Sequence, residues 1–105
     1  MATYDVVYWQ EIPVEVRARG DGITHQELLS GRFQRLVCDA ALQRRQAAAE
    51  DYIRHWVRSE PRDRPGSALE VARDVAREIE LQYDAIREGA LRRGAAAPAV
   101  HKRRP

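Results

Sequence analysis

Ser67–Ala90, with the sequence SALEVARDVAREIELQYDAIREGA, is the stretch that decides the fold of this chain. Its apolar side chains recur at alternating spacings of three and four residues, which places them on one face of a helix. The pattern therefore predicts a long amphipathic helix with a single apolar stripe. The stripe consists of Leu69, Ala72, Ala76, Ile79, Tyr83, Ile86 and Ala90.

The start of this helix carries its own signal. The Ser67 side chain can accept a hydrogen bond from the Glu70 amide, while the Glu70 carboxylate reaches back to the Ser67 amide, which is a capping box. Gly89 or Gly94 is expected to end the helix. On the polar faces, pairs three residues apart are expected to form weak ion pairs, as in Asp74 with Arg77, Arg77 with Glu80, and Asp84 with Arg87.

A helix of this length has a consequence for binding. About 23 residues span about 35 Å, which matches or exceeds the width of a domain of this size, so one end should overhang the core. We therefore expect an interface with a second copy or a partner protein, because an apolar overhang needs a cover. Its residues would be Tyr83, Ile86, Ala90 and Leu91. The alternative is that the sheet and the preceding helices bury the whole stripe.

Two further helical segments are predicted upstream. Ser30 can cap a helix from about Gly31, whose inward positions are Phe33, Leu36, Val37, Ala40 and Ala41. Its end stays open, because Gln46–Glu50 contains no glycine or proline. A second segment would turn Tyr52, Ile53, Trp56 and Val57 inward and Arg54, His55 and Arg58 outward. Pro61 and Pro65 end it within Ser59–Gly66.

The amino-terminal third has the alternation of strands. Tyr4–Trp9 is rich in β-branched and aromatic residues and is predicted to be a strand buried on both faces. After a turn at Gln10–Pro13, apolar and charged residues alternate over Val14–Arg19, which predicts a strand with one wet face. Gly20–Gly22 is a turn signal, and Ile23–Leu29 is the expected third strand.

Composition bounds the rest. The 105 residues suffice for one domain, and residues 1–91 carry 13 basic and 16 acidic side chains, a net charge of −3. Residues 92–105 carry five basic side chains and no acid, so we expect a disordered basic tail after a single domain at 1–91. The lone Cys38, the absence of a secretory pattern and the absence of a long apolar run predict a cytoplasmic protein without a membrane segment.

No constellation of catalytic or metal-binding residues appears. His25, His55 and His101 lie in separate segments without a metal-ligand spacing, so neither a metal nor another cofactor is expected. His55 is interpreted as a surface helix residue, one turn after Asp51 and a partner for it. Cys38, beside an apolar helix face, is interpreted as a small core residue and not as a nucleophile.

The two tryptophans leave two interpretations open. Trp9 lies beside Ile12 and Pro13, and Trp56 lies one turn after Tyr52. Both are large anchors that a small core would use, and the core is the favoured interpretation. Either residue is also a candidate interface residue, since tryptophan is enriched where proteins bind one another.

Four sequence features together resemble a known family. They are Tyr8–Pro13 (YWQEIP), Arg32–Gln34 (RFQ), Tyr52 with Trp56, and Glu70–Ala72 through Tyr83–Asp84. This arrangement is similar to a small bacterial family called virulence factor, which resembles a domain of conserved virulence factor C. The likeness extends to about Gly94, and the chain departs from the pattern between Leu42 and Ala49. The resemblance implies an α+β domain without assigned catalytic residues, often encoded near folate and corrinoid one-carbon methyl-transfer genes.

The sequence therefore predicts an α+β fold, with an antiparallel meander over residues 3–29 followed by two or three helices on one sheet face. The favoured function is a non-enzymatic accessory or interaction protein, with a protein partner or a second copy, and with a one-carbon methyl-transfer enzyme as the partner that the resemblance implies. One alternative is an enzyme subunit or small-molecule binder with a pocket between the sheet and the Phe33 helix. The other is a nucleic-acid contact through the basic tail, which the acidic body does not favour.

Overall fold

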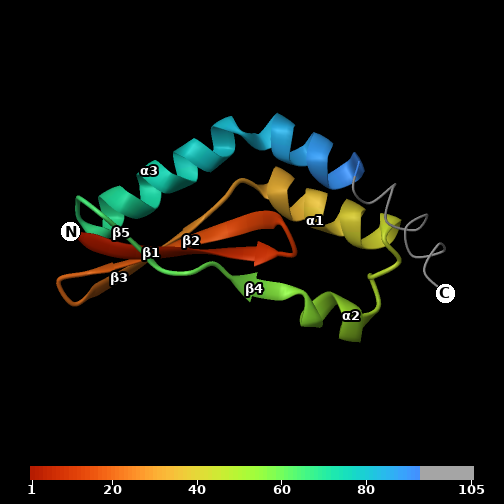
Figure 1. The fold of residues 1–105 in the computed structure, drawn as a ribbon, viewed down its shortest axis with the longest axis horizontal. Coiled ribbons are helices and arrows are strands. Elements are labelled where there is room, and N and C mark those ends of the chain that lie inside the picture. Colours follow the sequence, from red (N-terminus) through yellow and green to blue (C-terminus); the bar gives the residue numbers. More distant parts are fainter. Residues whose placement is uncertain (93–105) are drawn as a thin grey trace.

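The computed structural model describes residues 1–92, which form an antiparallel sheet with helices over one side (Figure 1). The sheet order is β3-β2-β1-β4, and β5 also pairs with β1. This confirms the α+β class and the meander, although the sheet has five strands where two or three were expected. The strands are β1 Ala2–Trp9, β2 Ile12–Gly20, β3 Ile23–Leu28, β4 Trp56–Arg58 and β5 Arg62–Arg64, and the helices are α1 Gly31–Gln43, α2 Ala49–Arg54 and α3 Ala68–Leu81.

Two tight turns connect the meander. Asp21 and Gly22 have φ angles of 51° and 76° and join the paired residues Gly20 and Ile23. These left-handed angles suit Asp and Gly, and they give a two-residue hairpin turn that matches strand twist. The first turn is shorter than expected, because Trp9 already pairs with Ile12, so only residues 10 and 11 lie outside the strands.

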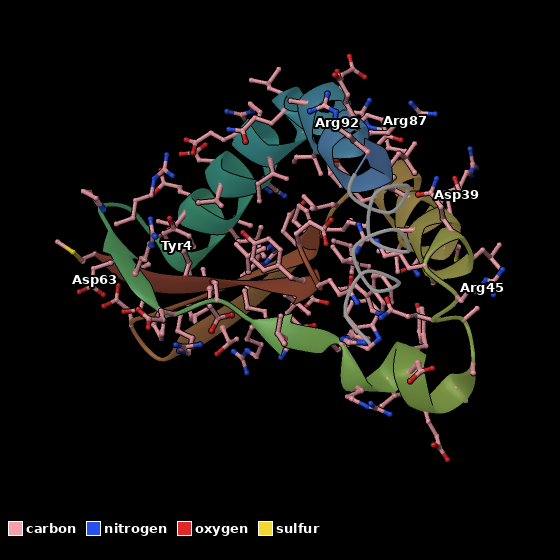
Figure 2. The ribbon with its side chains drawn as sticks, turned by 45° about the vertical axis from the view of Figure 1, so that its right-hand side comes forward. Tyr4, Asp39, Arg45, Asp63, Arg87 and Arg92 are labelled. Carbon is pink, nitrogen blue, oxygen red and sulfur yellow. The ribbon has the colours of Figure 1, made fainter. Side chains whose placement is uncertain are left out.

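The alternation along β2 sets the two faces of the sheet. Val16 and Ala18 are fully buried beneath the helices, whereas Arg19 on the other face is exposed. The predicted wet face of β2 is therefore confirmed. β1 departs from its prediction, because Tyr4, Val7 and Tyr8 are only half-buried. Tyr4 lies between α3 and the sheet (Figure 2). Burial on both faces would need a layer on the far side, and α1 and α3 cover one side only.

The second helical segment was predicted too long. α2 ends at Arg54, and Trp56–Arg58 forms β4 on the free edge of β1. Ile53 and Val57, expected to face inward, are 67% and 50% exposed. The backbone of β1 needs a partner along this edge, and that requirement outweighs the local helical pattern. The expected loop Ser59–Gly66 likewise contains β5, which pairs with the start of β1.

α1 follows its prediction closely, and α3 begins where it was predicted to begin. The buried face of α3 differs from the predicted stripe, because Leu69 is 40% exposed while Val71 and Val75 are buried with Ala72 and Ala76. The five inward residues expected on α1 are all buried. At α3 both hydrogen bonds of the Ser67–Glu70 capping box are present, at 2.9 and 3.1 Å, and they lower the Glu70 pKa. Ser30 is the N-cap residue of α1 but caps with no side-chain bond, because its hydroxyl is bound to Glu80.

The long helix is interrupted once. α3 ends at Leu81, Gln82 leaves the helical conformation, and the chain is helical again over residues 83–92 (Figure 1). We call residues 83–92 the terminal segment. It continues through Gly89, so this glycine does not end the helix, and the alternative end at Gly94 lies outside the described residues. The expected disordered tail lies, from residue 93 onward, outside the described residues.

Candidate functional site

An open hollow of about 350 Å³ lies between α1 and α2. Its floor includes the buried Ala41, and its rim includes the exposed side chains of Cys38 and Leu42. The remaining lining residues are Ala47 and Tyr52. The lining is mostly carbon, with one thiol and one tyrosine, so the hollow suits an apolar side chain better than a charged ligand. This hollow lies between two helices and differs from the pocket between the sheet and the Phe33 helix that the sequence suggested.

Cys38 does not have the position that the sequence predicted. Its side chain is exposed and its thiol is free. The helical period explains the difference, since α1 turns Val37 and Ala41 toward the core and Cys38 falls outside that inward arc. An exposed thiol at the rim of the hollow is available to reagents and contributes little to the core.

Aromatic contacts fix the wall of the hollow that α2 provides. The rings of Trp9 and Tyr52 are stacked with centroids 5.8 Å apart, and Trp56 meets Tyr52 edge-on at the same distance. The Trp9 indole also donates to the Tyr52 carbonyl at 2.8 Å. From α1, Gln34 donates to the Tyr52 hydroxyl at 3.1 Å. Trp9 is therefore a fully buried core residue, Trp56 is half-buried, and both hold α2 in place.

A polar cluster, which we call the Arg44 clasp, lies at the end of α1. The almost fully buried Arg44 guanidinium donates to both carboxylate oxygens of Glu11, at 2.9 and 2.5 Å, and to the Ala90 carbonyl at 2.9 Å. Gln10 accepts a further bond from Arg44 and donates to Gln46 at 2.7 Å. The clasp thereby joins the β1–β2 turn, α1 and the terminal segment, and a forked guanidinium suits this role.

His55 belongs to the edge of this clasp. Its Nε2 lies 3.3 Å from the Gln46 amide nitrogen, and its ring stands edge-on to Trp9. The expected pairing with Asp51 is wrong, since Asp51 pairs with Arg54 at 3.3 Å. α2 ends before His55, so the one-turn spacing on which that pairing depended is not present.

A third group of contacts joins the start of α1 to the end of α3. Glu80 accepts from the Ser30 amide at 2.6 Å and from its hydroxyl at 2.9 Å, and it pairs with Arg32 at 3.0 Å. Burial alone would raise the Glu80 pKa, but the bonds from Ser30 and Arg32 outweigh it and hold the pKa below its ordinary value. Of the expected helix pairs, Asp74 with Arg77 is present at 3.4 Å, whereas Glu80 contacts α1 instead of Arg77.

The terminal segment brings the predicted interface residues against α1. The Tyr83 ring lies edge-on to Phe33 with centroids 5.0 Å apart, and the Arg32 guanidinium lies 4.2 Å above it. Ala90 is buried, while Ile86 and Leu91 are partly buried against the core. Arg87 and Arg92 lie at the same end of the molecule as Asp39 of α1 (Figure 2). The break at Gln82 thus lets α1 cover much of the stripe, and a partner contact by these residues stays a prediction.

Asp5 forms an ion cluster on the open face of the sheet. Its buried carboxylate accepts from Arg58 at 2.7 Å and lies 3.6 Å from Arg19. The second carboxylate oxygen, Oδ1, is buried without a hydrogen-bond partner. These pairs join β1 to β2 and β4, and we interpret them as structural.

The described residues hold no cluster that would bind a metal. Within residues 1–92, no group of three His, Cys, Asp or Glu side chains is placed to share an ion. No helix in the same range is long and apolar enough to cross a membrane.

The sequence model of a family described as "Virulence factor" matches residues 7–91. The chain belongs to this family. The match extends from β1 into the terminal segment and so includes the hollow, the aromatic contacts and the Arg44 clasp. No curated protein and no solved structure matches the chain.

The family features quoted from the sequence are explained by structural contacts. The Tyr52 ring contacts the rings of both Trp9 and Trp56, and the Arg32 guanidinium lies over the Tyr83 ring. Arg44, Gln46 and Ser59 were not singled out from the sequence, because polar side chains carry no local signal of contacts more than 30 residues away. The sequence feature that could have indicated the clasp is the polar pair Gln10–Glu11, which lies within the quoted segment Tyr8–Pro13.

Proposed function

We propose that this chain is a small non-enzymatic accessory protein that acts by binding another protein. The observation that supports it is the apolar hollow between α1 and α2, whose rim residue Leu42 is 68% exposed. Exposed leucine beside an apolar recess is typical of a docking surface, because contact removes both from water. The polar side-chain groups that line the hollow are the free Cys38 thiol and the Tyr52 hydroxyl, which accepts a hydrogen bond from Gln34.

For the partner, we propose an enzyme of folate- or corrinoid-dependent one-carbon methyl transfer, which the family resemblance favours. An apolar residue of that enzyme would fill the hollow beside Leu42. Tyr52 offers the firm wall, since the contacts with Trp9 and Trp56 hold it before binding. A surface that is already ordered loses less conformational entropy on association.

The second candidate function is binding of a small molecule, alone or as an enzyme subunit, in the same hollow. The observation that favours it is the pairing of a recess of about 350 Å³ with the free thiol of Cys38. This volume is at the lower end of the range for ligand pockets. The nucleic-acid alternative depends on residues of the basic tail, which lie outside the described part from residue 93 onward.

Affinity purification from the native host tests the protein-binding proposal. The bait is the full chain, either unchanged or with Leu42→Asp at the rim of the hollow. Leu81→Asp is the matched control, because Leu81 is also exposed and helical but is not among the residues lining the hollow. Each captured protein is then purified and its affinity for the three baits is measured by calorimetry.

We expect a one-carbon enzyme to bind the unchanged and Leu81→Asp chains and to lose at least about tenfold in affinity for Leu42→Asp. Circular dichroism should show that both variants keep the fold. A partner that binds all three chains with equal affinity would show that its interface lies outside the hollow. Absence of any partner, together with a small molecule retained by the unchanged chain, would favour the second candidate.

A further inference from the structure

β3 is a six-residue edge strand with an open side. Among the strands within residues 1–92 it pairs with β2 alone, and the register from Glu15↔Leu28 to Gly20↔Ile23 is continuous, without a bulge. The strand ITHQEL contains no proline and no lysine, the residues that most often protect an exposed edge. The opposite edge differs, because β4 and β5 have only three residues each.

The hairpin turn determines which backbone groups of β3 are free. Gly20 and Ile23 flank a two-residue turn and so form a hydrogen-bonded pair, after which bonded and non-bonded pairs alternate. Odd-numbered residues therefore bond inward, and the Leu29 amide continues this series with a 2.9 Å bond to the Val14 carbonyl. The amides and carbonyls of Thr24, Gln26 and Leu28 point outward, and these three side chains are exposed.

We propose that β3 pairs with β3 of a second copy, antiparallel, across a two-fold axis at Gln26. Gln26 then faces its own equivalent, and Thr24 faces Leu28 of the second copy on either side of the axis. All three outward-pointing residues would be bonded, giving about six backbone hydrogen bonds. The two sheets would become one, and Leu28, now 71% exposed, would gain a neighbour on the same face. This inference goes beyond the proposed function and does not depend on it.

Hydrogen-bonding complementarity between the imidazole of His25 and the carboxylate of Glu27 selects the second copy and the register. His25 and Glu27 already contact each other within the strand at 2.9 Å. In the proposed register His25 of each copy lies opposite Glu27 of the other, so that unlike groups alternate across the axis. A shift to an axis at Glu27 places two glutamates opposite each other, which is unfavourable. An axis at His25 pairs the two histidines and leaves Leu28 outside the bonded pairs.

The two-fold axis also keeps the layers consistent. Opposed residues of an antiparallel pair lie on the same face, so the helix-covered sides of both copies coincide. α3 lies over β2 and β3, and its counterpart would lie over the other half of the joined sheet. The isologous arrangement closes on itself, as expected for a stable homodimer and not for a fibre.

Light scattering coupled to size exclusion, over a concentration series of the full chain, tests the proposal. Gln26→Lys places two lysines together on the axis, and Gln43→Lys is the matched control on exposed α1 surface. We expect a dimer that Gln26→Lys weakens at least about tenfold, because like charges directly opposite destabilise strand pairing. Gln43→Lys should leave the dimer unchanged.

A charge exchange tests the register itself. His25→Glu puts two carboxylates opposite each other and should weaken the dimer, whereas His25→Glu combined with Glu27→His should restore it. The thermal unfolding of each variant is measured in parallel, so that a loss of dimer is separated from a loss of fold. A monomer at every concentration would overturn the proposal. A dimer that Gln26→Lys leaves intact would also overturn it and would direct attention to the Tyr83 and Ile86 surface.

Discussion

Single polar side chains hold distant parts of this chain together. Arg44 reaches Glu11, Ser59 reaches Val6, and Glu80 reaches Ser30, across 33, 53 and 50 residues of sequence. The sequence shows the charge of Glu80 but suggests a partner on its own helix. Contact with Ser30 follows only once β3 leads into α1 beside the end of α3.

Glu80→Gln should therefore destabilise the protein by about 1–2 kcal/mol at pH 7, because a charge-assisted acceptor becomes a neutral one. The folded pKa of Glu80 is lowered from its ordinary value of 4.5. Its contribution is present above that value and is lost as the pH falls through the lowered pKa. The difference in unfolding free energy between unchanged protein and variant should accordingly shrink as the pH falls below 4.5, as measured by urea unfolding at several pH values.

Glu88→Gln provides the comparison for this experiment. Glu88 pairs with Arg92 on the exposed side of the terminal segment, with both side chains 71% exposed. Its loss should cost no more than about 0.5 kcal/mol. Equal effects of the two substitutions at pH 7 would mean that the bonds of Glu80 to α1 contribute nothing beyond an ordinary surface pair.

Elements whose residues show a periodic apolar pattern were predicted from the sequence. Elements whose conformation depends on pairing with a distant strand were not. The inward residues of α1, the capping box of α3 and the alternation of β2 follow from periodicity within one segment. β4 was predicted as helix, because Tyr52, Ile53, Trp56 and Val57 fit a helical spacing. The segment forms a strand because it pairs with the edge of β1. The sequence of residues 52–58 contains no pattern that indicates this pairing. The hollow between α1 and α2 was not predicted, because α2 was expected to continue through Val57.

The link between β4 and β5 can be tested at Ser59. Its amide donates to the Val6 carbonyl, and its hydroxyl accepts from the Val6 amide, both at 2.9 Å. Ser59→Ala removes the hydroxyl that accepts from the Val6 amide, and it should lower the free energy of unfolding by about 1–2 kcal/mol. A melting temperature lower by roughly 4–12 °C is expected, and hydrogen exchange at the Val6 amide should accelerate.

Ser59→Thr should preserve most of the stability, because the hydroxyl is retained. A full loss in the threonine variant would indicate that space, and not the hydrogen bond, is the critical property at this position. Unchanged exchange at Val6 in Ser59→Ala would show that water replaces the hydroxyl there.

At the scale of the whole molecule, the Arg44 clasp unites the sheet, α1 and the terminal segment. Arg44→Ala should destabilise by about 2–3 kcal/mol, since it removes three charge-assisted hydrogen bonds, two to the Glu11 carboxylate and one to the Ala90 carbonyl, at a partly buried site. Amides in the terminal segment should lose protection first, as hydrogen exchange measured by mass spectrometry would show.

Arg35→Ala is the matched control, because Arg35 is exposed on the same helix. It should change the free energy of unfolding by less than about 0.5 kcal/mol. If Arg44→Ala lowers the stability while protection of the terminal segment is retained, then the Phe33–Tyr83 contact alone fixes that segment to α1.

The central position of β1 has a consequence for synthesis. Val6 leaves the ribosome 53 residues before Ser59, the residue that completes its hydrogen bonds. At a synthesis rate of about 5–20 residues per second, β4 and β5 are made about 3–10 s after β1. One edge of β1, a strand rich in valine and aromatic side chains, is unpaired during this time. During that interval the nascent chain presents an aggregation-prone edge. We expect chaperones to engage this protein while it is being translated, and to release it once residues 56–64 have emerged.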